Sequence, residues 1–309
     1  MKQARQNARL SATESSREQD SIALKSAPLF VLPLLAVAAT SANAADLVEA
    51  PPPPEFTSIN YISIEGGPVW VSSDISASES DKLGNIEDGT GFYAAATYRR
   101  MFNPSWDWQI TGTGTWLGEA TADGLFDEKV KADLDFQTAD LDFGYHFNGN
   151  PLTRLLFGAR VLHSTNSLNY DSGEDFIGKS SYDAEGWAVG PRVGLQSETM
   201  LGASKFGFVA EASGSVLFGS FDVDRSALWG GGTESSSESR TVYNLEGLAG
   251  LSWHASDNLT FTIGYRAQQW WGLREDTSVV GAGFDGDYNI NVDEDVLVHG
   301  PFLRAGLTF

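Results

Sequence analysis

Pro301-Phe302-Leu303-Arg304-Ala305-Gly306-Leu307-Thr308-Phe309 closes the chain, and from Leu303 onward its side chains alternate between apolar and polar or small. In an extended strand such alternation places all apolar side chains on one face. A last strand of this kind that ends in an aromatic residue is typical of a membrane-spanning β-barrel, whose apolar face meets lipid and whose polar face meets a wet lumen. A soluble sandwich also ends on half-buried strands, so the inference depends on whether the pattern recurs.

The alternation recurs along the chain. The clearest example begins at Trp106, where tryptophans stand at both ends of the apolar face and small residues lie between them. Tryptophans at these places match the aromatic girdles at the two membrane interfaces. A fourth segment changes phase near Thr138, which predicts a bulge or a late strand start. The ten alternating segments are 58–71, 90–102, 106–117, 134–147, 155–170, 184–198, 205–218, 239–253, 259–271 and 295–309.

The connections between these segments also alternate in length. Short ones span 103–105, 148–154, 199–204 and 254–258, whereas long polar ones span 72–89, 118–133, 171–183, 219–238 and 272–294. Short periplasmic turns and long external loops are expected of an outer-membrane barrel with both termini in the periplasm. An even number of strands closes such a sheet without an edge. We predict an all-β, up-and-down antiparallel transmembrane barrel of ten strands over residues 58–309.

The N-terminus predicts export. Arg17 and Lys25 precede an apolar run over 27–39 that is too short for a transmembrane helix, and a small-x-small pattern at 42–44 follows. We therefore expect a signal peptide over 1–44, cut before Ala45, and a proline-rich lead-in over 45–57. The stretch before Lys25 is either a long n-region or an upstream extension of the true start.

The composition excludes several functions. The formal charge is -21; residues 1–44 hold five of the 20 bases and three of the 41 acids, so the mature chain has 15 bases against 38 acids, or -23. Nucleic-acid binding needs a basic surface and is not expected. The chain has no cysteine, which excludes disulfides, thiolate chemistry and cysteine-ligated metals. We expect no cofactor.

Several stretches resemble the Legionella-type major outer-membrane protein family. They are 64–70, 140–145, 157–160, 186–195 and 298–302, of which the Trp187-x-x-Gly190-Pro191-Arg192-x-Gly194 segment is the most specific. The resemblance covers nearly the whole mature chain and implies a pore-forming barrel in the bacterial outer membrane. It implies no catalytic residues.

Nine charged side chains are expected to face inward, each about five to seven residues from the periplasmic end of its strand. They form one belt near the middle of the barrel, and one interpretation is a constriction whose charges select solutes. The other is a set of ion pairs that fill a narrow lumen, because ten strands lie near the small end of barrel sizes. The nine residues are Glu65, Asp140, Asp142, Arg160, Arg192, Glu211, Glu246, Arg266 and Arg304.

The histidines do not predict an enzyme. The Asp-x-His of ten-stranded surface proteases does not occur, and the His-x-Ser of lipid hydrolases occurs only at His254-Ala255-Ser256, in a predicted periplasmic turn. The loop that begins Asp285-Gly286-Asp287 has Ile290 at the sixth position, where an EF-hand has glycine, and Val296 at the twelfth, where it has glutamate. Loop acids that hold divalent cations against lipopolysaccharide phosphates remain an alternative to a merely solvated loop.

The sequence favours a porin-like channel for passive diffusion of small hydrophilic solutes. The alternative is a closed structural or adhesive barrel that displays acidic loops. Expected partners are outer-membrane lipids, lipopolysaccharide, solutes and the barrel-assembly machinery, which would read Phe309 as an insertion signal; whether copies associate is left open.

Overall fold

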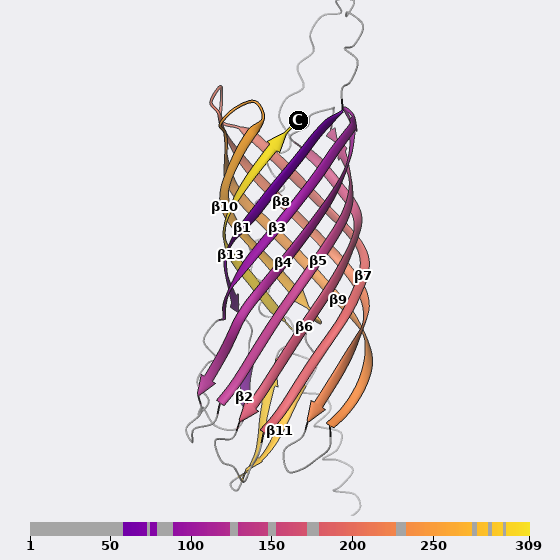
Figure 1. Ribbon diagram of the computed structural model, residues 1–309, viewed down its shortest axis with the longest axis vertical. Helices are drawn as coiled ribbons and strands as arrows, with labels where there is room; N and C mark the ends of the chain where they lie inside the picture. The colour runs from indigo at the N-terminus through magenta and orange to yellow at the C-terminus, as the bar shows by residue number, and fades with distance from the viewer. Residues whose placement is uncertain are drawn as a thin grey trace, which may run out of the picture. The chain divides into compact units, whose positions relative to one another are not determined.

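The chain folds into a closed antiparallel barrel of ten strands (Figure 1). The computed structural model describes residues 58–72, 75–78, 89–123, 129–147, 153–171, 179–226, 233–273, 277–283, 286–292 and 295–309. The predicted fold is confirmed. The barrel strands are β1 (Ile59–Ser72), β3 (Thr90–Asn103), β4 (Trp106–Asp123), β5 (Lys129–His146), β6 (Thr153–Asp171), β7 (Lys179–Met200), β8 (Phe206–Ser226), β9 (Thr233–His254), β10 (Leu259–Trp271) and β13 (Val296–Thr308).

Neighbouring barrel strands follow one another in the chain, and β13 pairs with β1 to close the sheet. Both terminal strands therefore have an end on the side of the short turns, where Figure 1 marks the C-terminus. We take this side as periplasmic. The predicted signal peptide and the lead-in lie outside the described residues. Among the described residues, no helix has the length and apolarity to span a membrane.

The middle strands are longer than the sequence pattern predicted. β7 and β9 each contain 22 residues, whereas β10 contains 13. The additional residues extend these strands on the external side, where no lipid enforces alternation of apolar and polar side chains. The periodicity therefore marked only the part of each strand inside the membrane.

Three further strands lie within regions that the sequence assigned to long loops. β2 (Ile75–Ser78), β11 (Thr277–Gly283) and β12 (Gly286–Val292) form a separate sheet in the order β11-β12-β2. The pairing of β12 with β2 joins the first long connection to the last one. Such pairing between distant segments has no signature in local sequence.

The outer face of the barrel has the predicted apolar side chains. Exposed aromatic residues stand near both ends of the membrane-spanning part, and exposed aliphatic residues lie between them. Trp116, Phe208 and Ile263 are examples, and all three side chains are exposed although they are large and apolar. This face contacts lipid.

The predicted change of phase on β5 near Thr138 was wrong. Alternate residues of β5 from Ala132 to His146 are buried without interruption, and β5 pairs with β6 in one register along its length. Leu134 and Phe136 face the lumen instead of the lipid. The sequence interpretation equated apolar with lipid-facing, and here apolar side chains fill the interior. The register shift in this part of the sheet lies on β4, between Leu117 and Ala120.

The hydrophobic core lies inside the barrel. All ten strands contribute at least one buried apolar side chain with the same inward parity as the predicted charged belt. These side chains lie on the external side of that belt, and we call them the apolar layer. Its members are Val69, Val71, Tyr93, Leu117, Leu134, Phe136, Leu162, Ala188, Leu217, Phe221, Val242, Trp270, Val296, Val298 and Phe302.

Candidate functional site

All nine charged residues of the predicted belt point into the barrel, and we call this set the charged layer. The alternation of the strands dictates this direction, because the other face of each strand meets lipid. Asp142, Asp140 and Arg160 are almost completely buried. The side chain of Glu211 retains 27 % of its exposure, the largest value in the layer. That these residues line a conducting pore stays a prediction.

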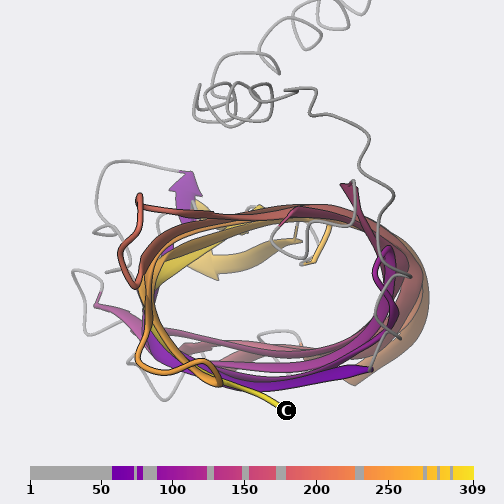
Figure 2. The ribbon, with the colours of Figure 1, turned by 90° about the horizontal axis from the view of Figure 1, so that it is seen from above.

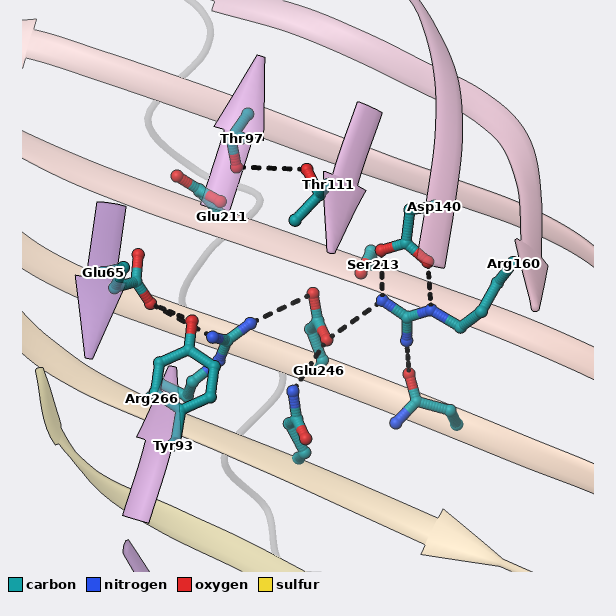
Figure 3. Close-up of polar contacts among 12 residues, drawn as sticks. Glu65, Tyr93, Thr97, Thr111, Asp140, Arg160, Glu211, Ser213, Glu246 and Arg266 are labelled. Atoms are coloured by element: carbon teal, nitrogen blue, oxygen red, sulfur yellow. Dashed lines mark hydrogen bonds and ion pairs between the residues drawn. The ribbon is translucent and has the colours of Figure 1, made fainter. Parts of the chain in front are cut away.

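Glu246 on β9 connects arginines from different walls of the barrel (Figure 3). It accepts a hydrogen bond from Arg160 at 3.3 Å and lies 3.6 Å from Arg266, as Figure 3 shows. It also accepts a hydrogen bond from Arg192 at 3.2 Å. β6 and β9 are separated by two strands in the barrel order. The contacts therefore cross the lumen rather than follow its wall.

Glu65 makes a second junction at the seam between the first and last strands. Its carboxylate accepts hydrogen bonds from Arg266 at 3.1 Å and from Arg304 at 2.5 Å, and the Tyr93 hydroxyl also donates to it. Arg304 is the register partner of Glu65 on β13, and it also reaches Glu211 at 2.7 Å. The guanidinium of Arg266 lies 4.2 Å from the ring centroid of Tyr93.

The remaining ion pairs complete a single network. Arg160 donates to both oxygens of Asp140 at 2.7 Å, and Arg192 contacts Asp142 and lies 3.6 Å from Asp140. Every member of the charged layer is thus linked to the others through the junctions at Glu246 and Glu65. Four arginines against five carboxylates leave the layer close to neutral, which a narrow interior requires.

A second polar cluster lies on the periplasmic side of the charged layer. Arg154 donates two hydrogen bonds of 2.8 Å to Asp107, whose other partner is His146 at 2.6 Å. Arg154 also donates to Gln196 at 2.6 Å, and Gln196 donates to Glu211 at 2.7 Å. Hydrogen bonds therefore connect this cluster to the charged layer.

Sequence reasoning missed these residues for identifiable reasons. The sequence pattern places Arg154 in the short connection 148–154, whereas β6 begins at Thr153. Asp107 is the second residue of β4 and lies closer to the strand end than the belt, and His146 is the last residue of β5. The inward parity of all three was readable from their strands; their mutual contact depends on the stagger of β4, β5 and β6.

The apolar layer closes the lumen on the external side. Trp270, Leu162, Leu217 and Val242 each have 0 % exposure, and the layer as a whole does not exceed 6 %. A bore wide enough for water would expose some of the side chains that border it. The side chains of the apolar layer therefore border no water-wide path in this structure. A cavity of about 20 Å³ borders the charged layer, enough for about one water molecule.

A phenyl ring and an indole ring meet across this layer. The rings of Phe136 on β5 and Trp270 on β10 lie 5.2 Å apart in an edge-to-face arrangement. β5 and β10 stand on opposite sides of the barrel in the strand order. The guanidinium of Arg160 lies 5.9 Å from the Trp270 ring, so the two layers are in contact.

The histidines have separate surroundings. His254 is the last residue of β9 rather than part of a turn; it contacts Glu198 at 2.8 Å and Thr260 at 3.3 Å. Ser256 lies in the turn itself and accepts hydrogen bonds from the backbone N–H groups of Asn258 and Leu259. His254 and Ser256 of the His-x-Ser motif therefore have different partners, and none of these hydrogen bonds joins the two side chains. His163 faces outward and packs on Trp187 with ring centroids 4.3 Å apart.

An acidic hollow of about 650 Å³ lies on the outer face of the external strand extensions. Burial raises the pKa of Asp183, and the nearby negative charge of Asp224 raises it further. No group of three or more His, Asp or Glu with the geometry for a metal ion occurs among the described residues. The side chains of the loop after Asp285 lie outside the described residues, so the cation contact there stays a prediction. The six acids of the hollow are Asp133, Asp135, Asp183, Glu185, Asp222 and Asp224.

Phe309 ends the chain beside the start of β1. Its backbone N–H donates to Asn60 at 2.9 Å and its carbonyl accepts from Asn60 at 2.8 Å. The phenyl ring is exposed on the barrel surface. Its use as an insertion signal stays a prediction.

The family comparison decides the class of this barrel. Residues 77–309 match the model of the family described as Legionella pneumophila major outer membrane protein precursor. The chain belongs to this family. It is an outer-membrane protein, as the sequence predicted. The stretch 64–70 on β1, one of those that resemble the family, precedes the matched range. No curated protein sequence matches the chain.

Solved outer-membrane barrels are similar in outline only. The outer-membrane protease OmpT of Escherichia coli has 12 % identity and a TM-score of 0.49, over 82 % of this chain and 97 % of that one. The translocator domain of NalP from Neisseria meningitidis has 11 % identity and a TM-score of 0.42, over 83 % and 90 %. A major outer membrane protein of Thermus thermophilus has 12 % identity and a TM-score of 0.36, over 82 % and 100 %. These likenesses assign no activity to the chain.

Proposed function

We propose that the protein is a porin-like outer-membrane channel for small hydrophilic solutes and that its described conformation is the closed one. The observation that carries the proposal is the charged layer. A barrel with a purely structural role would be as stable with an apolar interior, because burying ion pairs costs desolvation that hydrophobic packing avoids. Nine charges across the lumen instead offer a hydrophilic solute partners of both signs.

Selectivity would follow from the arginines that border the one-water cavity. Arg192 and Arg266 face it beside Glu211 and Glu246. A solute that enters this level must replace ion pairs with its own charges or hydroxyl groups. Passage would therefore depend on solute charge, and the apolar layer would supply a dry barrier that must part for conduction.

A closed structural or adhesive barrel is the second candidate, and the apolar layer favours it. Complete burial of Trp270 and Leu217 is what a permanently sealed barrel requires. Both candidates share the fold and the location. The proposal assigns no catalysis to the histidines: His254, His163 and His146 contact carboxylates in separate surroundings rather than around one reaction centre.

Planar-bilayer recording tests the proposal. The purified folded barrel should give infrequent discrete conductance steps, and Arg304→Gln should shift the preference toward cations. Arg225→Gln is the control, because Arg225 lies on the external extension of β8 with 34 % of its side chain exposed. Absence of steps from a folded barrel would support the closed candidate. Steps with the selectivity of the wild type in Arg304→Gln would remove the charged layer from the conduction path.

A further inference from the structure

The ladder between β1 and β13 is interrupted in the middle of the strands. Pairing extends to Gly66 opposite Leu303 and resumes in the same register at Trp70 opposite His299. Within the gap the register places Pro68 opposite Pro301. Neither residue has a backbone N–H, so neither can donate across the seam.

A second interruption lies between β7 and β8. Pairing extends to Val189 opposite Phe218 and resumes at Arg192 opposite Ser215, with Gly190-Pro191 inside the gap. Two other ladders have register shifts nearer a strand end, β3–β4 between Met101 and Asn103 and β4–β5 between Leu117 and Ala120. The remaining adjacent barrel strands are paired without a gap. Both interruptions therefore coincide with Gly-Pro dipeptides.

Glycine and proline have complementary roles at these interruptions. A Cβ atom at Gly67 would lie 2.1 Å from the Pro301 carbonyl oxygen, and one at Gly190 would lie 1.9 Å from that of Val216. The backbones thus touch where the hydrogen bonds are missing. Proline leaves no unsatisfied N–H in the hydrocarbon region, where such a group is costly. The seams remain closed, but fewer hydrogen bonds fix the angle between their strands.

The two interruptions divide the barrel into two strand groups. In the barrel order, one group is β13, β10, β9 and β8, and the other is β7, β6, β5, β4, β3 and β1. Viewed from above, the barrel has a flattened outline (Figure 2). A change in angle at the two seams would round this outline and widen the lumen, while every other strand pair keeps its hydrogen bonds.

The junctions of the charged layer connect these two groups. Glu246 belongs to the first group and binds Arg160 and Arg192 of the second. Glu65 belongs to the second group and binds Arg266 and Arg304 of the first. Asp140 differs, because its partners Arg160 and Arg192 are both in its own group.

We propose that the two Gly-Pro seams are hinges between the strand groups and that Glu65 and Glu246 hold the groups together in the closed conformation. This inference deepens the proposed channel function and rests on it. Opening would separate the carboxylates from their arginines in the opposite group and the ring of Phe136 from that of Trp270. Ion pairs within each group would persist.

Distance measurement between two spin labels tests the hinges. Leu141 on β5 and Ile263 on β10 are exposed on the outer face, on opposite sides of the barrel, and the chain has no native cysteine. The Leu141→Cys/Ile263→Cys pair in lipid should give one main distance. Adding Glu65→Gln/Glu246→Gln should produce a second distance in roughly a tenth or more of the molecules. Asp140→Asn is the matched control and should retain the single distance.

Restoring donors to the seams supplies the converse test. Pro68→Val/Pro301→Val should suppress the second distance in the Glu65→Gln/Glu246→Gln background, whereas Ala249→Val on the uninterrupted β9 should not. If the double glutamine variant fails to fold, Glu246→Gln alone decides. A single distance identical to that of Asp140→Asn would overturn the hinges. A second distance without conductance would support the hinges and contradict the channel function. Conductance without a second distance would support the channel function and contradict the hinges.

Discussion

Arg160→Met should destabilise the barrel by about 3 kcal/mol. Arg160 has 2 % exposure and donates to Asp140 at 2.7 Å through two nitrogens, to Asn244 at 2.5 Å and to Glu246 at 3.3 Å. Removing one partner of a buried ion pair costs roughly 3–5 kcal/mol, because the other charge stays buried. Arg192 remains within 3.6 Å of Asp140 and 3.2 Å of Glu246, so the lower end of the range applies.

The assay is urea-dependent unfolding in lipid vesicles, followed by tryptophan fluorescence. Arg225→Met is the control: its pair with Glu238 at 3.0 Å is about one-third exposed and should contribute less than about 1 kcal/mol. Asp140→Leu/Arg160→Met removes both charges and should recover at least about half of the loss. An Arg160→Met barrel within about 1 kcal/mol of the wild type would refute the account of the charged layer as a buried network.

Three further predictions concern other parts of the barrel. Trp270→Ala should cost about 3–5 kcal/mol in the same urea assay because it empties the centre of the apolar layer, whereas Trp187→Ala on the outer face should cost clearly less; equal losses would contradict the assignment. The negative charge of Asp224 contributes to the raised pKa of Asp183. Ionisation of Asp183 therefore destabilises the fold as the pH rises through the raised pKa of this carboxyl group. Asp224→Asn should therefore raise the urea midpoint at pH 7 and lose this advantage below the ordinary pKa of 3.8, and a gain that persists at lower pH would need another cause. Phe309→Asp should lower the amount of barrel in outer-membrane fractions relative to the wild type, and equal amounts would exclude recognition of the terminal residue.

The sequence carried enough information for the ten strands because lipid imposes a strict rule on one face. Residues such as Leu303 and Ile263 must be apolar where they meet hydrocarbon, so their period of two reveals each strand. The same rule sends a charge such as Arg160 inward. The ten strands and the direction of the nine charges were therefore predictable from alternation alone.

The interior was less predictable because no such rule applies to it. Leu134 and Phe136 are apolar but face the lumen. Because apolar side chains are expected to face lipid, their pattern wrongly predicts a change of phase near Thr138. The pairing of Arg160 with Glu246 depends on how far two side chains reach across a lumen whose width the sequence does not state. The sheet of β2, β11 and β12 joins segments about 200 residues apart, and local patterns do not encode such pairs.

Thiol accessibility inside the apolar layer tests most directly whether the resting lumen is closed. Leu217 has 0 % exposure and Asp224, on the same strand, is exposed on the outer face. With no native cysteine, Leu217→Cys and Asp224→Cys can each be treated with a membrane-impermeant cationic thiol reagent in the folded barrel. We predict rapid modification of Asp224→Cys and modification of Leu217→Cys that is roughly tenfold to a thousandfold slower until urea unfolds the protein. Equal rates at the two positions in the folded barrel would contradict the closed lumen.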